Sequence, residues 1–448
     1  MLAFCPQLCR RRGRALRRIR GQTRRSMTVA PIRAREEESR AKAAPAPEAQ
    51  ILPRLGPGCP FLCFAGLDWW YHNHAHSDFQ LMLRIAQQRK VLLINSLGMR
   101  MPRPGKTSKS FRRILRKLRS IGRGLRRPIP ELPEFRVLSP LVLPAYGSRR
   151  GRRWSARLVR SQVLAAMRRC RIEAPHVIVT VPTAVDVALA LPERSSLIYN
   201  RSDKHSAFEE SQQGVIRGLE EKLFTHADRV LYASRELMSQ EEQTLGGRAV
   251  HLDHGVDLAS FTRATEEEIP ACIRELPHPR IGWFGTLRES VVDFVLLERI
   301  ARELPHAQLV LVGDVTAELG DWAGLPNVHL LGKQPHQCIP VLGSGFDVGI
   351  MPWLQNEWVR SANPIKLKEY LALGLPIVSM QFPEAEHYSQ FLSLANDHAS
   401  FIAALRRTLE AEQATDPGKQ RAAVAHCDWV HRAADLATIC DRISEGKG

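Results

Sequence analysis

Residues 363–379 read NPIKLKEYLALGLPIVS, and they predict a helix that leads directly into a buried strand. Pro364 suits the first turn of a helix, where its missing N–H is not needed, and Asn363 can cap that turn. Gly374 ends the helix, and the apolar, β-branched run that follows it is typical of a strand in a covered sheet. The segment therefore predicts one helix-to-strand unit of an α/β protein.

Similar units lie on both sides of this segment. Short apolar runs rich in β-branched residues alternate with stretches of helical spacing, which indicates parallel sheets covered on both faces. The expected strands are 61–65, 91–95, 176–181, 196–200, 229–233, 280–284, 309–313, 328–332, 346–352 and 375–379, and the expected helices include 77–89, 291–303 and 364–374. We therefore expect an α/β fold of two doubly wound parallel sheets in tandem, joined near 255–275, with a ligand cleft between them.

The chain has 448 residues, which is too long for one compact core and favours two domains. No apolar stretch approaches the ~18 residues of a membrane-spanning helix, and nine cysteines favour a reducing compartment. The net charge of +18 is uneven, because residues 1–44 carry +10, residues 100–171 carry +20, and the rest sums to −12. We expect residues 1–55 to form a basic, disordered tail, and the asymmetry indicates a polyanionic partner or surface.

The join between the two halves carries a pair of ordered motifs. Residues 227–234 read ADRVLYAS, and residues 254–257 read HGVD, with Phe261 beyond them. The pair resembles the passage ADxVixxS … NGVDxxxF of GT-B glycosyltransferases, where the chain leaves the acceptor domain for the nucleotide-sugar domain. Residues 363–379 resemble the donor-binding helix of that family, NPxKxxEYLAxGxPVVS. The chain thus resembles the group 1, family 4-like enzymes, most closely the teichuronic acid biosynthesis glycosyltransferases and more loosely xanthan glucuronosyltransferase.

The resemblance implies two Rossmann-like domains that face a central cleft. It implies an N-terminal acceptor domain over 56–256 and a C-terminal nucleotide-sugar domain over 257–448, whose last helix we expect to return to the N-terminal domain. The implied activity is metal-independent transfer of a sugar from a nucleotide diphosphate sugar, UDP-linked, to a saccharide or lipid-linked acceptor in cell-surface polysaccharide or glycolipid biosynthesis. The nucleotide sugar is a substrate, so no cofactor and no metal are expected, and the sequence has no Asp-x-Asp motif of the kind that metal-dependent GT-A enzymes require.

The resemblance also assigns donor-binding residues to the second half. Glu369 takes the ribose hydroxyls, and Lys366, three residues earlier on the same helix face, neutralises the departing diphosphate. The loop of Gly285 and Thr286 meets the diphosphate through backbone N–H groups at a helix N-terminus. The expected donor set is completed by Gly332, Lys333 and Asn363. The alternative is an ordinary helix with solvated lysines.

One position departs from the family pattern. Many retaining members carry two glutamates separated by seven residues, and the residue eight positions before Glu369 is Ser361. The missing carboxylate puts retaining stereochemistry in doubt. An inverting transfer needs a base that accepts the proton of the acceptor hydroxyl, and Asp203, at an acidic position of the subgroup's YDxxDD motif, is our candidate. The alternative for Asp203 is a residue that caps the next turn.

A second candidate cluster follows the first strand, where residues 68–76 read DWWYHNHAH. Histidines and aromatic rings at the carboxyl end of a strand suit proton transfer and sugar stacking. We expect His76 to be a second catalytic candidate and four neighbours to contact the acceptor, namely Trp69, Tyr71, His72 and His74. A metal site on the alternating histidines is disfavoured because helix-based ligand pairs prefer a spacing of three or four, and plain loop structure is the other alternative.

Residues 110–127 predict a basic amphipathic helix inside a membrane-facing insert over 100–171. The residues expected at the membrane are Phe111, Arg112, Arg113, Ile114, Leu115 and Leu118. Such a helix is typical of one that lies on an anionic membrane, where each cation contributes about 1 kcal/mol. We expect a peripheral protein on the cytoplasmic face of the cell membrane, although a helix packed on its own domain is the alternative. Nucleic acid is not an expected partner, because this stretch has one aromatic residue and the chain has no recognised binding motif.

Two rival functions stay open at this stage. A sugar-nucleotide epimerase could use the same fold, but it would need no membrane surface. A non-catalytic polyanion-binding or nucleic-acid-binding protein is the other rival, and the intact segment 363–379 argues against it.

Overall fold

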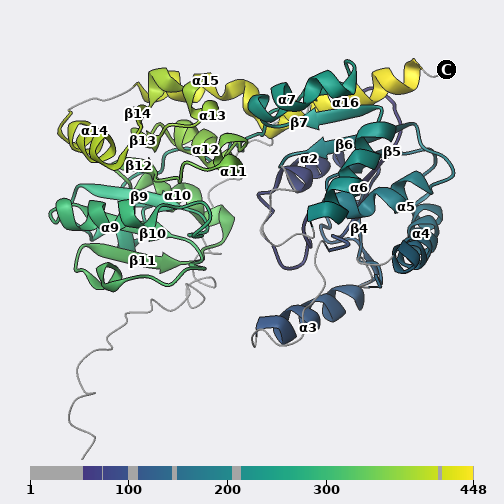
Figure 1. Ribbon diagram of the computed structural model, residues 1–448, viewed down its shortest axis with the longest axis horizontal. Helices are drawn as coiled ribbons and strands as arrows, with labels where there is room; N and C mark the ends of the chain where they lie inside the picture. Colours follow the sequence, from purple (N-terminus) through teal and green to yellow (C-terminus); the bar gives the residue numbers. More distant parts are fainter. Residues whose placement is uncertain are drawn as a thin grey trace, which may run out of the picture. The chain divides into compact units, whose positions relative to one another are not determined.

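The computed structural model of the chain is an α/β protein with two sheets (Figure 1). It describes residues 54–72, 74–98, 109–143, 149–203, 213–411 and 416–446. The predicted tail therefore lies outside the described residues, except for residues 54 and 55. Among the helices that are described, none combines the length and the apolar character needed to span a bilayer.

The first sheet has eight strands in the order β3-β4-β2-β1-β5-β6-β7-β8, and every neighbouring pair is parallel except β3 with β4. The strands are β1 Phe61–Phe64, β2 Val91–Ile94, β3 Leu125–Arg126, β4 Phe135–Leu138, β5 His176–Val179, β6 Ser196–Arg201, β7 Arg229–Tyr232 and β8 Ala249–His251. The strand order reverses between β1 and β5. Doubly wound sheets bind ligands at the carboxyl ends of the strands beside such a reversal, so the loop after β1 is well placed for function.

The second sheet has six parallel strands in the order β11-β10-β9-β12-β13-β14. They are β9 Arg280–Phe284, β10 Gln308–Val312, β11 Val328–Gly332, β12 Val348–Met351, β13 Ile377–Met380 and β14 Ser393–Ala395. Here the order reverses between β9 and β12. The loop after β9, which begins at Gly285, therefore lies at the position that binds ligands in such sheets.

Helices connect the strands and cover both sheets (Figure 1). The α-helices are α2 Ser77–Ile85, α3 Lys109–Ile121, α4 Arg149–Cys170, α5 Val185–Leu189, α6 Gln213–His226, α7 Arg235–Glu241, α8 Ala271–Arg274, α9 Phe294–Glu303, α10 Ile339–Ser344, α11 Glu357–Arg360, α12 Ile365–Leu373, α13 Pro383–Glu386, α14 His398–Glu410, α15 Pro417–Ala423 and α16 Trp429–Glu445. The short 3-10 helices are η2 Pro182–Ala184, η4 Glu242–Leu245, η5 Asp321–Gly324, η6 His336–Cys338, η7 Ser389–Phe391 and η8 Ala425–Cys427.

The strands are buried on both faces, as their continuous apolar runs predict. In β1, Leu62 and Phe64 belong to one hydrophobic cluster, and Phe61 and Cys63 belong to another on the opposite face. Successive side chains of a strand point to opposite faces, so one short run supplies both layers of the core. The second sheet is buried in a single large cluster that includes Leu367, Tyr370 and Leu371 of α12.

The last helix packs on the first sheet, although it follows the second sheet in sequence. Trp429 and Ala433 of α16 share a cluster with Phe79 and Met82 of α2, and the two helices lie side by side in the structure. An ion pair between Arg89 and Asp441, with an N···O distance of 2.7 Å, closes the contact at the far end.

Part of the predicted basic insert over 100–171 belongs to the first sheet and to its core. β4 pairs with β2 within the first sheet, and Phe135 is fully buried there. α4 buries Val159 and Val163, one turn apart, in the cluster on one face of that sheet. Its many arginines occupy the other faces of the helix, so the charge of the segment conceals residues that belong to the core.

The basic helix is shorter than the predicted 110–127. α3 ends at Ile121, because Gly124 has a φ of 56° and Leu125 begins β3. The predicted strands are confirmed to within two residues at each end, whereas β3, β4, β8 and β14 were not predicted. Four of the residues expected at the membrane have side chains outside the described residues, namely Phe111, Arg112, Arg113 and Ile114.

Candidate functional site

Lys366 of α12 lies against the loop that follows β9. A β-carbon added to Gly285 would lie 2.5 Å from Lys366 Nζ, so the ammonium occupies the space that a side chain at 285 would need. Lys366 Nζ also lies 3.4 Å from the centroid of the Trp283 ring. Burial lowers the pKa of Lys366 to about 7, although the Glu369 carboxylate acts in the opposite direction. An anion bound at this loop would stabilise the charged form of the lysine.

The loops after β9, β10 and β11 are packed closely through glycines. Gly285 and Gly313 have φ values of 133° and 156°, and a β-carbon on Gly313 would lie 1.8 Å from the carbonyl oxygen of Gly285. The Gly313 N–H donates to the carbonyl oxygen of Gly332 at 2.8 Å. Only glycine fits at 285 and 313, which explains why two of the predicted loops carry it.

The backbone of the Gly285 loop corrects one expectation. The N–H groups of Gly285 and Leu287 donate to the carbonyl oxygens of Val312 and Asp314, at 2.8 and 2.9 Å. These bonds extend the pairing of β9 with β10, so these two N–H groups are already used. The helix that follows, α9, begins nine residues after Gly285, and Asp293 caps its first turn. The expected helix N-terminus is therefore not at this loop, and Lys366 is the cation that reaches it.

Glu369 is nearly buried and is held by a histidine that the sequence analysis missed. Its Oε1 lies 2.9 Å from His336 Nε2, and the side chain keeps 9% of its surface exposed. Burial lowers the pKa of His336, but the hydrogen bond and the charge of Glu369 raise it, and the net shift is upward. His336 begins η6, three residues after Lys333, and no sequence motif marks it. The pairing fixes the orientation of the carboxylate.

The Asn363 side chain is hydrogen-bonded to one residue after β7, one after β8 and one in α12. Its side-chain N–H groups donate to the Ala233 carbonyl oxygen and to Asp253 Oδ1, each at 2.7 Å, and its Oδ1 accepts from Lys368 Nζ at 2.8 Å. The cap prediction for Asn363 is wrong, because Pro364 holds the N-cap position of α12 without a side-chain bond. Both N–H groups of the amide are therefore used within the protein, and its oxygen already accepts one bond. The donor role of Asn363 stays a prediction.

Lys368 and Asp253 form a buried ion pair beside Asn363, with an N···O distance of 2.8 Å. Burial raises the pKa of Asp253, but Lys368 lowers it more, and the net shift is strongly downward. Burial lowers the pKa of Lys368, but Asp253 together with Tyr388, Glu384 and Cys427 raises it, and the net shift is upward. Both groups are therefore charged at neutral pH. Lys368 ties α12 to the segment that follows β8, whereas Lys366, two residues earlier, points to the β9 loop.

The remaining residues of the predicted donor set are exposed. Thr286 follows Gly285 at the surface of the β9 loop, and Gly332 and Lys333 lie at the end of β11. Because Gly332 is bonded to Gly313, these residues belong to the same group of loops as Gly285. Their donor role stays a prediction.

Three other histidines from both halves of the chain lie close enough to His76 for their charges to interact with it. Burial lowers the pKa of His76, and His72 and His336 lower it further, against an opposing effect of Asp78. Burial likewise lowers the pKa of His254 to about 4, with Lys368 and His76 as further causes and Asp253 opposing them. His76 is nevertheless exposed to solvent. Because its pKa is lowered, His76 is neutral at pH 7.

Asp203 follows β6 and is the last described residue before residue 213. Burial raises the pKa of Asp203, and the charges of Arg201 and Arg288 lower it by less, so that the net shift is upward. Arg288 belongs to the loop after β9, so Asp203 faces the second half of the chain. The neighbouring Arg201 is held in ion pairs with Glu220 and Glu241. A carboxylate with a raised pKa is a better base than a free aspartate.

Only some side chains of the aromatic cluster after β1 are exposed to solvent. Trp69 keeps 4% of its surface exposed, because it packs on Phe79 and Phe135 and is stacked on His74 at a centroid distance of 3.8 Å. Trp69 therefore belongs to the core in this structure, and burial lowers the pKa of His74. His72 is exposed, with its Nδ1 3.0 Å from the Asp68 carbonyl oxygen. The acceptor contacts predicted here thus concern Tyr71 and His72 more than Trp69.

One group in the described part of the chain has the donor atoms for a metal. Potential ligand atoms of Asp253, His426 and Cys427 lie within 4.8 Å of one another. Asp253 is already paired with the buried Lys368 ammonium, and burial raises the pKa of the Cys427 thiol to about 11. A neutral thiol and a neighbouring ammonium both disfavour a bound cation.

Comparison with known proteins agrees with this geometry. Residues 278–411, which contain the β9 loop, His336, Lys366 and Glu369, match the family described as "Glycosyl transferases group 1". The chain carries a group 1 glycosyltransferase domain. It is a distant homologue of the "Putative teichuronic acid biosynthesis glycosyltransferase TuaH" of Bacillus subtilis, to which it is 25% identical over 219 residues, covering 46% of this chain and 55% of that protein. The chain thus aligns with little more than half the length of this curated relative.

Solved structures confirm that the two sheets form a GT-B fold. Anabaena Alr3699/HepE in complex with UDP and glucose superposes with a TM-score of 0.59 at 16% identity, covering 85% of this chain and 99% of that chain. Sucrose-phosphate synthase from Thermosynechococcus elongatus gives 0.58 at 14%, covering 87% and 98%. The catalytic domain of starch synthase IV from Arabidopsis thaliana gives 0.55 at 11%, covering 87% and 99%. At these identities the group 1 domain shares its fold with these proteins, and function must be argued from its own residues.

Proposed function

We propose that this protein is a glycosyltransferase that moves a sugar from a UDP-linked donor to a saccharide or lipid-linked acceptor. The observation that carries this proposal is the position of Lys366 against Gly285, with Glu369 one turn away on the same helix and held by His336. The HepE structure with UDP-glucose supports a UDP-linked donor, and the name of TuaH supports an acceptor in cell-surface polysaccharide synthesis.

Lys366 binds the diphosphate of the donor at the Gly285 loop. Its pKa of about 7 leaves it partly neutral in the free protein, and the negative charge of the diphosphate favours its protonated form. When the bond between the sugar and the phosphate oxygen breaks, negative charge grows on that oxygen. A buried cation beside it stabilises the transition state more than the bound donor, which is the requirement for catalysis without a metal ion.

Glu369 accepts hydrogen bonds from the ribose hydroxyls while His336 holds the carboxylate at its other side. The acceptor lies on the first half of the chain, beside the loop after β1 and the end of β6. Its hydroxyl loses a proton to a base as its oxygen bonds to the sugar carbon, and UDP departs with the electron pair of the broken bond. Asp203 and His76 are the two candidate bases, because each has a pKa shift that suits proton acceptance at neutral pH. Since Ser361 replaces the glutamate of many retaining members, we assign the reaction to inversion.

We further propose that the protein lies peripherally on the inner face of the cell membrane, and the basic surface of the first half supports this location. α3 packs inward through Ser120, whose hydroxyl donates to Asp68 at 2.7 Å, and through Lys117, whose Nζ donates to the Ser96 carbonyl oxygen at 2.7 Å. Leu118 on the same helix keeps 59% of its surface exposed. Arg116 and Arg119, which flank it, are also exposed to solvent. These three side chains form the membrane-facing side of α3.

A panel of nucleotide diphosphate sugars tests the proposed reaction. Purified protein is incubated with each donor, and release of the nucleotide is followed together with any change in the sugar. The proposal expects one UDP-sugar to be bound and slowly hydrolysed, and Glu369→Ala to abolish that binding. Conversion of the nucleotide sugar to its epimer without release of UDP would instead support an epimerase, and failure of every nucleotide sugar to bind would end the proposal.

A further inference from the structure

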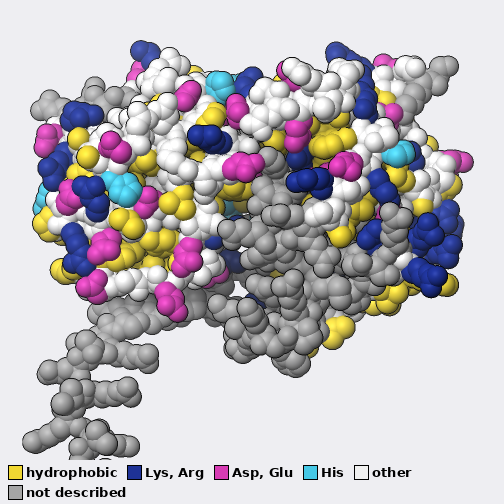
Figure 2. Space-filling view, viewed as in Figure 1, with side chains coloured by type: hydrophobic (Ala, Val, Ile, Leu, Met, Phe, Trp, Pro, Cys, Tyr) yellow, Lys and Arg dark blue, Asp and Glu magenta, His cyan; other side chains and the backbone are white. Residues whose placement is uncertain are grey.

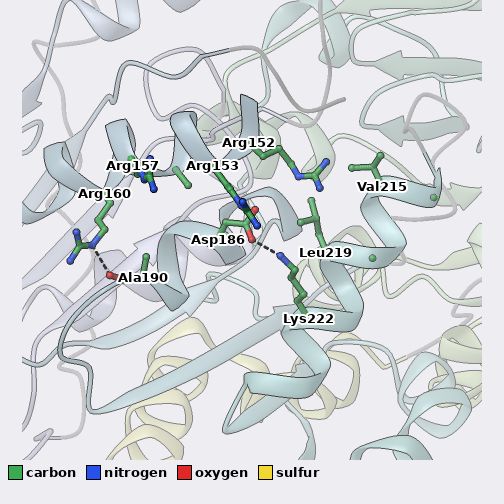
Figure 3. Close-up of a pocket in the computed structure, with 12 residues that line it drawn as sticks. Arg152, Arg153, Arg157, Arg160, Asp186, Ala190, Val215, Leu219 and Lys222 are labelled. Carbon is green, nitrogen blue, oxygen red and sulfur yellow. Dashed lines mark hydrogen bonds and ion pairs between the residues drawn. The ribbon is translucent and has the colours of Figure 1, made fainter. Parts of the chain in front are cut away.

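A basic groove lies on the first half of the chain, apart from the residues of the proposed sugar site. It has a volume of about 860 Å³ and is formed by α4, α5 and α6 (Figure 3). The charged side chains that line it are Arg152, Arg153, Arg157, Arg160, Lys222 and Asp186. We call this site the arginine groove. Figure 2 shows Lys and Arg side chains gathered on the right-hand edge of the molecule, over α4.

Among the described residues, the lining of the arginine groove has five cationic side chains and one carboxylate, that of Asp186. Arg153, Arg157 and Arg160 recur at helical spacing on one side of α4. Arg160 Nε donates to the Ala190 carbonyl oxygen at 2.6 Å, and Lys222 pairs with Asp186 at 2.7 Å across α5 and α6. α4 also has no acidic residue in its first turn, where arginines face the positive end of the helix dipole. The net positive charge of this lining attracts anions.

Glycines form part of the lining of the arginine groove. Gly214 and Gly218, one turn apart on α6, both line it, and a β-carbon added to either would meet no atom within 4 Å. Larger residues would be better helix formers at these positions. The glycines thus keep the groove deep enough for a group to enter between the arginines of α4 and the backbone of α6.

Large apolar side chains are exposed around the same helix. Trp154, between the groove residues Arg153 and Arg157, keeps 64% of its surface exposed, and the Arg157 guanidinium carbon lies 5.4 Å from the centroid of its ring. Leu141 is 45% exposed and is held to α4 by two hydrogen bonds with Gln162. Exposed tryptophan next to arginine is typical of residues at the boundary between lipid and water. The described residues that line the groove include no aromatic ring, which disfavours stacking of nucleic-acid bases.

We propose that the arginine groove binds the phosphate of an anionic lipid headgroup, with Trp154 inserted at the membrane boundary beside it. The phosphate accepts hydrogen bonds from the guanidinium groups of α4, which suit phosphate oxygens in geometry and charge. The groove thus supplies a headgroup site that is separate from α3 and from the residues that bind the sugar donor. This proposal does not depend on the proposed sugar transfer, because its test measures only binding to the groove.

Sedimentation of the full chain with phospholipid vesicles tests the arginine groove. Wild-type protein should bind vesicles of phosphatidylcholine that contain phosphatidylglycerol and should not bind vesicles of phosphatidylcholine alone. The double variant Arg153→Gln/Arg157→Gln should lose binding roughly 25-fold, at about fivefold per cation removed. The matched control Arg406→Gln/Arg407→Gln removes the same charge from exposed positions of α14 and should bind as wild type.

Gly218→Leu separates a groove from general attraction, because it fills the space and keeps every charge. It should weaken vesicle binding as strongly as the loss of two arginines, and Trp154→Ser should weaken it as well. Equal losses in the groove and control variants would reduce the effect to net charge and overturn the proposal. So would wild-type binding by Gly218→Leu, binding of inorganic pyrophosphate in place of vesicles, or tighter binding to single-stranded RNA than to the vesicles. Thermal unfolding of each variant verifies that it is folded.

Discussion

The Nζ atom of Lys366 lies 2.5 Å from the point at which a β-carbon on Gly285 would stand. A residue of α12 and a residue of the β9 loop, far apart in sequence, therefore compete for one space. The absence of a side chain at 285 allows the lysine to reach the loop. Lys366 can therefore hold this position only while residue 285 is glycine.

Gly285→Ala should weaken the binding of UDP roughly tenfold or more. The methyl group would displace Lys366 Nζ, and the φ of 133° would be strained for alanine by about 1–3 kcal/mol. Isothermal titration calorimetry with UDP measures the affinity. Gly214→Ala, where the added carbon meets nothing within 4 Å, should bind UDP as wild type. Unchanged affinity in Gly285→Ala would contradict the contact.

UDP affinity should fall as the pH rises above 7. The pKa of Lys366 is about 7 in the free protein, and bound diphosphate raises it, so binding takes up a proton wherever the free lysine is neutral. The affinity should then fall by about tenfold per pH unit from pH 7 up to the pKa of the complex. Titrations in buffers of different ionisation enthalpy measure the proton uptake. In Lys366→Gln this uptake should disappear, and its persistence would assign it to another group.

His336→Ala should act on donor binding more than on the rate of the chemical step. Without the hydrogen bond at 2.9 Å, the Glu369 carboxylate loses its fixed orientation toward the ribose, and KM for the donor should rise about tenfold. The change in kcat should be smaller. His306→Ala, at an exposed position of the same domain, serves as the control. A large fall in kcat with unchanged KM would assign His336 to the chemistry instead.

Lys368→Met should destabilise the protein by about 3–5 kcal/mol, because it leaves the buried Asp253 carboxylate without its partner. The ion pair is 2.8 Å long, and the lysine side chain has no exposed surface. Urea unfolding measures the change. The double variant Lys368→Met/Asp253→Asn should recover part of the loss, since neither charge then remains buried. If the single variant is as stable as wild type, the pair does not join α12 to the first half of the chain.

Asp203→Asn and His76→Gln should distinguish the two candidate bases. Loss of the true base should lower the rate of transfer by about 10²–10⁴ while the affinity for UDP stays unchanged, because neither residue belongs to α12 or the β9 loop. The other variant should retain most of the rate. Transfer assays with the donor found in the panel provide the measurement. Equal, small effects in both variants would remove both residues from the role.

The apolar runs of the chain predicted both sheets, because a strand buried on two faces must be apolar at every position. Phe61–Phe64 and residues 281–284 of β9 are examples in which a few consecutive residues suffice. The same rule failed for β4, since Phe135, Val137 and Leu138 are interrupted by Arg136 and lie within an arginine-rich segment. Charge that covers the outside of α4 concealed the apolar positions that face the core.

The sequence by itself predicted the α/β fold, because local order within one helix and strand is written in consecutive residues, and by resemblance it indicated the family. The donor roles of Lys366 and Glu369 stay predictions. The sequence could not show that His336 is hydrogen-bonded to Glu369, that Asn363 and Lys368 both bind Asp253, or that Trp69 belongs to the core. Those facts depend on which loops meet at the carboxyl ends of the strands. Such meetings join residues more than thirty positions apart, so only the packed structure, in which every buried polar group must find its partner, decides them.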